Sequence, residues 1–212
     1  MLAIEQLSHG YSGRPVLSRF DFHQAKGEHS LLIGPSGSGK TTLINVIAGL
    51  LTPDAGSVLI DGEAMTVASA RMRDALRRRK IGLIFQTLRL VSALSIVANL
   101  RLARRLAGAG PDERALRALL DAVGIAHRAD AKPRELSQGE AQRAAIARAL
   151  VAQPTLLIAD EPTSALDDAN AERIGRLLLD TATANGSTLL IATHDVRLKS
   201  LIPRAVSLEP AP

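Results

Sequence analysis

The chain has 212 residues, of which 46% are hydrophobic, enough for one sizeable core, and its formal net charge is +5. It contains no cysteine, which excludes disulfides, zinc ribbons and thiol catalysis, and its five histidines show no metal-ligand spacing. Aromatic residues make up only 2%, so Leu, Ile, Val and Ala must form the core, and no apolar run approaches the roughly 20 residues of a membrane span.

The first part of the chain alternates strand and helix patterns. A short apolar strand at 29–34 leads through a Gly/Ser loop into a helix that starts near residue 40. A turn-bounded strand follows at 56–62, then a basic helix at 70–80 and a strand at 81–85. This rhythm is typical of α/β proteins.

The middle of the chain, from about residue 88 to residue 134, reads as helices alone, and another helix follows the stretch "LSQGE" at 136–140. Strands return at 155–160 and 187–193, with a helix between them and a last strand near "RAVSLE". Because the strands are almost continuously apolar, we expect a parallel sheet covered on both faces, with a helical lobe inserted into it.

A phosphate-binding loop is the most specific local signal. The stretch "GPSGSGKT" fits G-x-x-x-x-G-K-[ST] completely and lies between a predicted strand and a predicted helix. Its glycines let backbone N–H groups surround phosphates, Lys40 reaches the β and γ oxygens, and the Thr41 hydroxyl suits Mg²⁺. The candidate nucleotide-binding residues of this segment are Gly34, Pro35, Ser36, Gly37, Ser38, Gly39, Lys40, Thr41 and Thr42.

Two acidic residues follow the strand "TLLIA", at the edge of an open α/β sheet where ligands bind. Asp160 is suited to hold Mg²⁺, and Glu161, one residue further on, could polarise an attacking water. An acidic residue at a strand end is by itself a weak signal, since it could also cap a helix. The phosphate-binding loop in the same chain favours the functional interpretation.

A second anion-binding helix start is predicted at "LSQGE". Ser137 is a preferred N-cap residue, and a helix N-terminus presents unpaired N–H groups and a partial positive charge. The sequence therefore contains two phosphate-seeking helix starts in one small protein.

The ordered motifs resemble those of the ATP-binding subunits of ABC transporters, over essentially the whole chain. The markers are "GPSGSGKTT", Gln86 in "FQ", "LSQGEAQR", "LLIADEP", "SALD" and His194 in "THD". The resemblance implies a P-loop NTPase (RecA-like) α/β fold with a parallel-sheet core, an N-terminal antiparallel β part and an inserted α-helical subdomain. It also implies a single domain over 2–212, with the core at about 1–86 and 154–212 and the helical subdomain at about 87–153.

The same resemblance assigns roles to individual residues. It implies head-to-tail pairing of two copies, in which Ser137 and Gly139 of one copy grip the γ-phosphate of the ATP bound by the other. Glu161 and His194 would be catalytic, with the histidine supporting the glutamate.

Further roles implied by the resemblance concern the nucleotide, the metal and the dimer. Thr41, Gln86 and Asp160 would hold Mg²⁺. Tyr11 would stack on adenine, and Asp167 would lie at the dimer seam. The expected cofactors are ATP and Mg²⁺. The expected partners are a second copy and transmembrane permease subunits, with the protein cytoplasmic and peripheral on the inner face of the membrane.

The stretch "LSQGE" at 136–140 corresponds to the signature motif of the family. It departs from the family pattern at Gln138, where glycine is usual, and at Glu140, where glutamine is usual. Because Ser137 and Gly139 remain, we expect hydrolysis to survive. "RRRKIGLIFQ" and "LSQGEAQRAAIARAL" look like the small lipoprotein-releasing and macrolide-exporter group. By contrast, "TSALD" differs from the "TGNLD" common there, and "TLRLVSAL" lacks the usual proline.

Other functions remain open at this point. One is a non-transport ABC ATPase that signals through a membrane partner, as in cell division; another is a DNA- or ribosome-associated ABC ATPase. The second lacks support, because the chain has one cassette and no coiled-coil insertion. A basic set in the 70–80 helix invites a nucleic-acid interpretation, but a solvated helix face is favoured and no nucleic-acid partner is expected. This set is Arg71, Arg73, Arg77, Arg78, Arg79 and Lys80.

Overall fold

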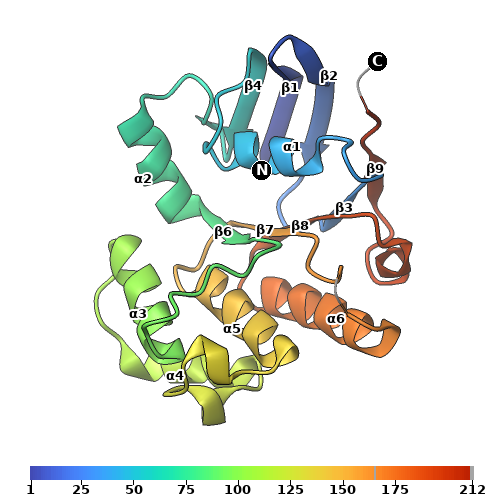
Figure 1. The fold of residues 1–212 in the computed structure, drawn as a ribbon. Helices are drawn as coiled ribbons and strands as arrows, with labels where there is room; N and C mark the ends of the chain where they lie inside the picture. The colour runs from blue at the N-terminus through green and yellow to red at the C-terminus, as the bar shows by residue number, and fades with distance from the viewer. Residues whose placement is uncertain (165, 211–212) are drawn as a thin grey trace.

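The computed structural model describes residues 1–164 and 166–210, and its described strands form two sheets (Figure 1). The first is antiparallel, in the order β2-β1-β4-β5, with β1 (Leu2–Tyr11), β2 (Arg14–Gln24), β4 (Ala55–Ile60) and β5 (Glu63–Ala64). The second is parallel, in the order β6-β7-β8-β3-β9, with β3 (Ser30–Ile33), β6 (Ile81–Ile84), β7 (Leu156–Asp160), β8 (Thr188–Thr193) and β9 (Ala205–Ser207). The predicted α/β fold with an antiparallel part is confirmed.

The central strands β7 and β8 are buried along their whole length, as expected for a parallel sheet covered on both faces. Their register sets the position of everything that follows them. Asp160 at the end of β7 pairs with Ala192 of β8, and Thr193 at the end of β8 pairs with Ile33 at the end of β3. The loops after these three strands therefore begin side by side.

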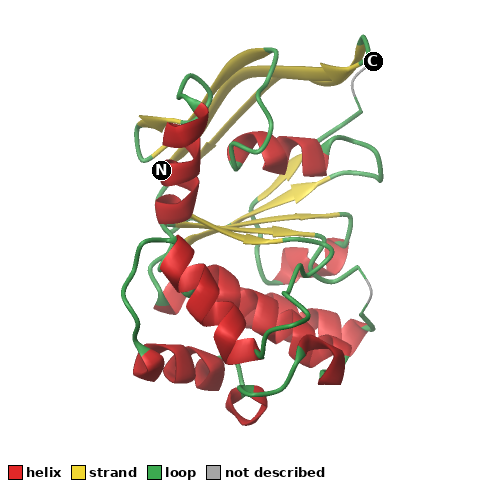
Figure 2. Ribbon diagram, turned by 60° about the vertical axis from the view of Figure 1, so that its left-hand side comes forward, coloured by secondary structure: helices red, strands yellow, loops and turns green. Residues whose placement is uncertain are grey.

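Helix α1 (Lys40–Ile47) lies between the two sheets (Figure 2). Its apolar side chains, among them Leu43 and Ile47, belong to a buried cluster with Ile4 of β1 and Ile158 of β7. The antiparallel sheet therefore covers one face of the parallel sheet through α1, which fixes the start of this helix at the sheet edge. Helix α2 (Ala70–Lys80) joins this layer to β6.

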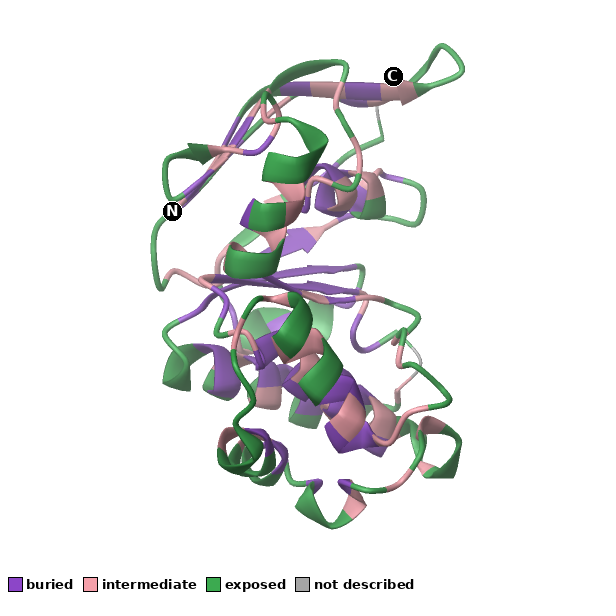
Figure 3. Cartoon of the chain, turned by 90° about the vertical axis from the view of Figure 1, so that its left-hand side faces the viewer, coloured by how far each residue is buried: buried purple, intermediate pink, exposed green. Residues whose placement is uncertain are grey.

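The other face of the parallel sheet is covered by helices, whose buried residues face inward (Figure 3). These are α3 (Ile96–Leu106), α4 (Glu113–Ala122), α5 (Gln138–Leu150) and α6 (Asp168–Ala184), with short 3₁₀ turns η1 (Ala126–Arg128), η2 (Pro133–Glu135) and η3 (Val196–Ser200). One apolar cluster contains Leu120 of α4, Leu157 of β7 and Leu178 of α6. A division of the chain at 87 and 153 stays a prediction, since this core spans both parts.

A buried carboxylate ties the loop after β8 to the start of α6. Asp195 accepts hydrogen bonds from Thr163 Oγ1 at 2.9 Å and from Arg197 Nε and Nη2 at 2.7 Å each. Arg197 also pairs with Asp168 in the first turn of α6. The Arg197 guanidinium, more than any other neighbour, lowers the pKa of Asp195 from 3.8 to about 2.

This network predicts an acid-sensitive contribution to stability. The folded-state pKa of Asp195 lies below its unfolded value, so its contribution is present above about pH 4 and is lost as the pH falls towards 2. We expect Asp195→Asn to lower the free energy of unfolding by about 1–2 kcal/mol at pH 6 and by much less near pH 2. Urea denaturation at both pH values measures this, with Asp180→Asn on the exposed face of α6 as the control. A difference that did not change with pH would contradict the prediction.

Candidate functional site

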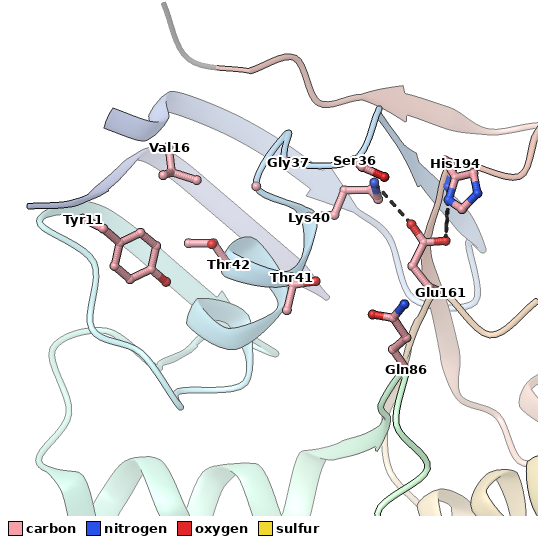
Figure 4. A pocket seen from close by; sticks show the side chains of 11 residues that line it. Tyr11, Val16, Ser36, Gly37, Lys40, Thr41, Thr42, Gln86, Glu161 and His194 are labelled. Atoms are coloured by element: carbon pink, nitrogen blue, oxygen red, sulfur yellow. Dashed lines mark hydrogen bonds and ion pairs between the residues drawn. The ribbon is translucent and has the colours of Figure 1, made fainter. Parts of the chain in front are cut away.

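A pocket of about 430 Å³ lies at the carboxyl edge of the parallel sheet (Figure 4). Its walls come from β1 and β2 of the antiparallel sheet, from the loop before α1 and the start of that helix, and from the loops after β6, β7 and β8. It is lined by Tyr11, Val16, Ser36, Gly37, Gly39, Lys40, Thr41, Thr42, Gln86, Glu161 and His194. Ten of these eleven were candidate site residues, and Val16 is the one that was not singled out from the sequence, so the pocket gathers most of the predicted site.

 

The predicted phosphate-binding loop supplies most of these residues, among them Gly39. The loop joins β3 to α1, as expected, and Gly39 is the N-cap of the helix. Gly37 and Gly39 have φ values of 82° and 95°, in the left-handed region that favours glycine. A Cβ atom on Gly39 would approach Val16 Cγ1 to 2.9 Å, so a larger residue would not fit beneath β2.

Lys40, the first residue of α1, is buried although it carries a charge. Its Nζ donates hydrogen bonds to the carbonyl oxygens of Gly34 at 2.7 Å and Pro35 at 3.0 Å. It also lies 3.3 Å from Glu161 Oε1. The ammonium group is therefore held at the base of the pocket by oxygens that phosphate oxygens could replace.

A buried pair of oxygen donors lies beside this lysine. Thr41 Oγ1 donates a hydrogen bond to Asp160 Oδ2 at 3.0 Å, and Asp160 Oδ1 is buried without a hydrogen-bond partner among the described residues. Burial raises the pKa of Asp160, with the hydrogen bond from Thr41 opposing it. A carboxylate oxygen without a partner next to a hydroxyl is the kind of oxygen donor set that Mg²⁺ takes in phosphate sites.

Glu161 connects the other charged groups of the pocket (Figure 4). Its Oε2 lies 2.9 Å from His194 Nδ1 and accepts a hydrogen bond from Thr193 Oγ1 at 3.3 Å, while Oε1 faces Lys40. The φ of Glu161 is 48°, a left-handed conformation that is uncommon for a residue with a side chain. Such backbone conformations persist where the surrounding structure holds them, and they cluster at active sites.

Gln86 and Tyr11 enter the pocket from opposite sides. Gln86 follows β6 and points towards the Glu161 side, whereas Tyr11 ends β1 on the far side (Figure 4). The Tyr11 ring is half exposed and contacts the His9 ring edge to face, with 4.9 Å between centroids. An exposed aromatic face next to a phosphate-binding loop is suited to stack against a flat, apolar ring of a bound ligand.

Several predicted residues lie outside this pocket. Ser38 is fully buried, and Gly34 and Pro35 line a neighbouring cavity together with His194. Asp167 is exposed and acts as the N-cap of α6, where its carboxylate accepts hydrogen bonds from Asn170. Its proposed place at a dimer seam stays a prediction.

The second predicted anion site also lies apart from the pocket, at the start of α5. Ser137 is the N-cap of this helix, as predicted, and its Oγ accepts a hydrogen bond from the backbone N–H of Glu140 at 3.3 Å. Gln138 is the first residue of the helix. The helix start therefore forms with glutamine at position 138.

Sequence reasoning missed three side chains that contact predicted site residues. Val16 packs against the phosphate-binding loop, Thr193 bonds to Glu161, and Arg128 pairs with Glu140. Thr193 directly precedes His194 and could have been suspected from that position. The other two come from segments remote from any motif, so no local signal pointed to them.

Three basic residues of helix α2 form ion pairs. Arg79 pairs with Glu63, and Lys80 Nζ lies 2.9 Å from Asp61 Oδ2. Arg77 pairs with Asp74 within the helix. Three of the six basic residues that suggested a nucleic-acid surface are therefore paired with carboxylates.

The chain resembles known proteins over nearly its whole length. A model of the family described as "ABC transporter" matches residues 17–164. The lipoprotein-releasing system ATP-binding protein LolD of Bacteroides fragilis is 36% identical over 98% of this chain and 97% of its own length. LolD 1 of Rhodopirellula baltica is 42% identical over 93% of this chain and 89% of its own length.

Solved structures give the same answer for the fold. The dimeric structure of MJ0796, a bacterial ABC transporter cassette, has a TM-score of 0.89 and 31% identity, covering 98% of this chain and 94% of that one. A dimeric post-hydrolysis state of MJ0796 bound to ADP and Pi has a TM-score of 0.90 and 30% identity, covering 99% and 94%. The chain therefore belongs to the ABC transporter family, as an ATP-binding subunit with ATPase activity.

Proposed function

We propose that two copies of this chain pair head to tail around two ATP molecules and drive separate membrane-spanning subunits. The observation that carries the proposal is the separation of two anion-binding helix starts on one chain. The pocket at the P-loop is lined by no residue of 136–140, so a phosphate bound at the start of α5 would have to come from another molecule. Both structures of the similar cassette MJ0796 are described as dimeric.

Each copy binds ATP in the pocket at the P-loop. Lys40 exchanges the carbonyl oxygens of Gly34 and Pro35 for phosphate oxygens, and backbone N–H groups of the loop, including those of Ser36 and Gly37, surround the phosphates. Tyr11 offers its exposed ring to the adenine. The remaining loop residues, Ser38, Gly39 and Thr42, shape this cradle.

Mg²⁺ is the cofactor that this pocket fits, because Thr41 and Asp160 supply adjacent oxygen donors and one Asp160 oxygen has no partner among the described residues. Gln86, which also lines the pocket, would contribute a third oxygen. When bound, the ion neutralises phosphate charge during hydrolysis.

Glu161 is the residue that polarises the attacking water, and His194 supports it. The imidazole Nδ1 at 2.9 Å and the Thr193 hydroxyl hold the carboxylate in one orientation. Phosphate binding draws Lys40 away from Glu161 Oε1, which leaves that oxygen to accept a proton from water.

Gly139 supports the role of the α5 start. A glycine inside a helix costs about 1 kcal/mol relative to alanine, and a Cβ at this position would meet nothing within 4 Å in the chain. Packing within the described chain therefore gives no reason for glycine here. Close approach of the partner's γ-phosphate, gripped by Ser137 and the backbone, supplies one.

A groove of about 310 Å³ between β6 and α3 is the docking place that we propose for the membrane subunit. Leu50 and Leu106 are exposed residues that line it. Phe85, the residue directly before Gln86, also lines it. A partner seated there is linked to the metal and water site through Gln86. Among the described residues, the helices are too short or too polar to cross a membrane. Because the chain is similar to ATP-binding subunits of a lipoprotein-releasing system, we place it on the cytoplasmic face, peripheral to its partner, and copurification of a membrane protein tests this.

Removing the P-loop ammonium should weaken ATP binding. We expect Lys40→Ala to raise the dissociation constant of ATP at least tenfold, because charge-assisted hydrogen bonds to phosphate are lost. Isothermal titration calorimetry measures this, with the exposed Lys199→Ala as the matched control. Equal affinities for the wild type and Lys40→Ala would contradict the assignment.

The pairing and the catalytic role are tested together by Glu161→Gln. The exchange keeps the shape of the site and removes the charge, so hydrolysis should fall by about 10²–10⁴ while ATP and Mg²⁺ still bind. Size-exclusion chromatography with ATP and Mg²⁺ should show a lasting dimer, and adding Ser137→Arg should return the protein to monomer. A Glu161→Gln variant that hydrolyses ATP at the wild-type rate would remove Glu161 from the mechanism.

Replacing Gly139 with alanine is expected to stabilise the monomer and to weaken the ATP-dependent dimer. Gly139→Ala should raise the free energy of unfolding of the monomer by about 0.5–1 kcal/mol. In the Glu161→Gln background it should weaken the ATP-dependent dimer, because the methyl group occupies the approach of the phosphate. Gln138→Gly is the control and should leave turnover within a few-fold. A dimer that tolerates Gly139→Ala without loss would argue against contact at this helix start.

A further inference from the structure

An ionised carboxylate lies directly behind the serine of the signature. Glu140 Oε2 accepts hydrogen bonds from the backbone N–H of Ser137 at 2.8 Å and from its Oγ–H at 2.9 Å. Together with the bond from the Glu140 N–H to Ser137 Oγ, these contacts form a capping box. The same geometry places a negative charge beside the hydroxyl that is proposed to meet the partner's γ-phosphate.

This charge stays in place at every pH at which the protein is expected to work. The hydrogen bond from Arg128, followed by those from Ser137, lowers the pKa of Glu140 to about 2. A carboxylate near a phosphate opposes its approach, and it also offsets the partial positive charge of the helix N-terminus. The start of α5 therefore needs a fixed cation if it is to receive an anion.

Arg128 provides that cation from outside the signature. Its Nε donates a hydrogen bond to Glu140 Oε1 at 2.7 Å, on the carboxylate oxygen that Ser137 does not use. His127 Nε2 lies 3.5 Å from the same oxygen, but its side chain is mostly exposed and is charged only when protonated. A guanidinium remains charged at any working pH, so Arg128 is the permanent partner.

The backbone holds Arg128 in this position. It ends η1, between Ile125 and Ala129, which are both buried in the apolar core of the helical layer. The Val97 N–H of α3 donates to the Ala129 carbonyl oxygen at 2.8 Å. The cation is therefore supplied by the packing of the helical layer and not by the flexible end of a surface loop.

We infer that Arg128 is a positioning residue of the proposed site in which ATP lies between two paired copies. It neutralises Glu140 so that the start of α5 can accept the γ-phosphate of the ATP bound by the partner. The inference rests on the proposed function, since it concerns the pairing of two copies. It explains how this chain can carry a glutamate at position 140, beside the serine proposed to meet the phosphate. With glutamine at 140 the capping box would persist and no compensating cation would be required.

The experiment is a double-mutant cycle in the Glu161→Gln background. The ATP concentration that gives half-maximal dimer is measured by analytical ultracentrifugation in Mg²⁺ for the parent, Arg128→Gln, Glu140→Gln and the double variant. Arg128→Gln should raise this concentration about five- to tenfold, as loss of one compensating charge at an interface does. Glu140→Gln should leave it equal or lower it, and the double variant should lie within about twofold of the parent.

Matched controls separate charge from folding. Arg101→Gln removes another arginine of the helical layer, whose Nε lies 2.6 Å from Glu113 Oε1 at an exposed site, and it should change nothing. Binding of a fluorescent ATP analogue to the variants at concentrations too low for pairing should match the parent, because each chain's own P-loop lies elsewhere. Higher salt should reduce the effect of Arg128→Gln.

Two results would overturn the inference while leaving the pairing intact. One is an Arg128→Gln variant that dimerises like the parent, and the other is a double variant as impaired as Arg128→Gln alone. If Arg128→Gln failed to fold, Glu140→Gln alone would decide, since a weaker dimer than the parent's would contradict the repulsive role of this charge. A parent that forms no dimer with ATP, and is unaffected by Ser137→Arg, would instead remove the proposed pairing itself.

Discussion

The register of three parallel strands is the constraint on which the rest of the site depends. Ile33, Asp160 and Thr193 stand at neighbouring strand ends because β3, β7 and β8 pair in parallel without a shift. Parallel strands leave all their carboxyl ends at one edge, so the loops that follow share one space. Lys40, the acidic pair at the end of β7 and His194 approach one another for this reason. A slip of one residue in β7 would turn its side chains to opposite faces and would remove the acidic pair from the edge.

The pocket keeps several charges away from water, which is costly unless they are paired. Lys40 and Asp160 are both nearly fully buried, and Glu161 is 11% exposed at its side chain. Lys40 is satisfied by two carbonyl oxygens and by Glu161, whose other oxygen is held by His194. Only one oxygen of Asp160 lacks a partner among the described residues. The proposed ATP and Mg²⁺ would provide partners for the same buried charged groups whose burial lowers the stability of the protein without ligand. Ligand binding should therefore raise the free energy of unfolding.

The two helix starts that are proposed to contact each ATP, one from each copy, differ in how they are built. The start of α1 is preceded by glycines with left-handed backbone and relies on N–H groups and one lysine. The start of α5 is a capping box closed by a carboxylate, which stabilises the helix but adds negative charge. Arg128 offsets this charge from η1. Stability of the helix and affinity for phosphate thus make opposing demands at Glu140, and the arginine reconciles them.

Features that depend on neighbouring residues could be predicted from the sequence. The P-loop, the Ser137 N-cap and the alternation of strands and helices from β3 onwards follow from local spacing and conformational preference, whereas β1 and β2 were expected only through the family resemblance. The family resemblance likewise came from contiguous motifs. Only the tertiary structure showed that Thr193 holds Glu161, that Val16 closes over the loop, and that Arg128 reaches Glu140 from twelve residues earlier. These contacts join segments that no short-range pattern relates, because packing of the helical layer and pairing of the strands, acting over the whole chain, set the distances between them.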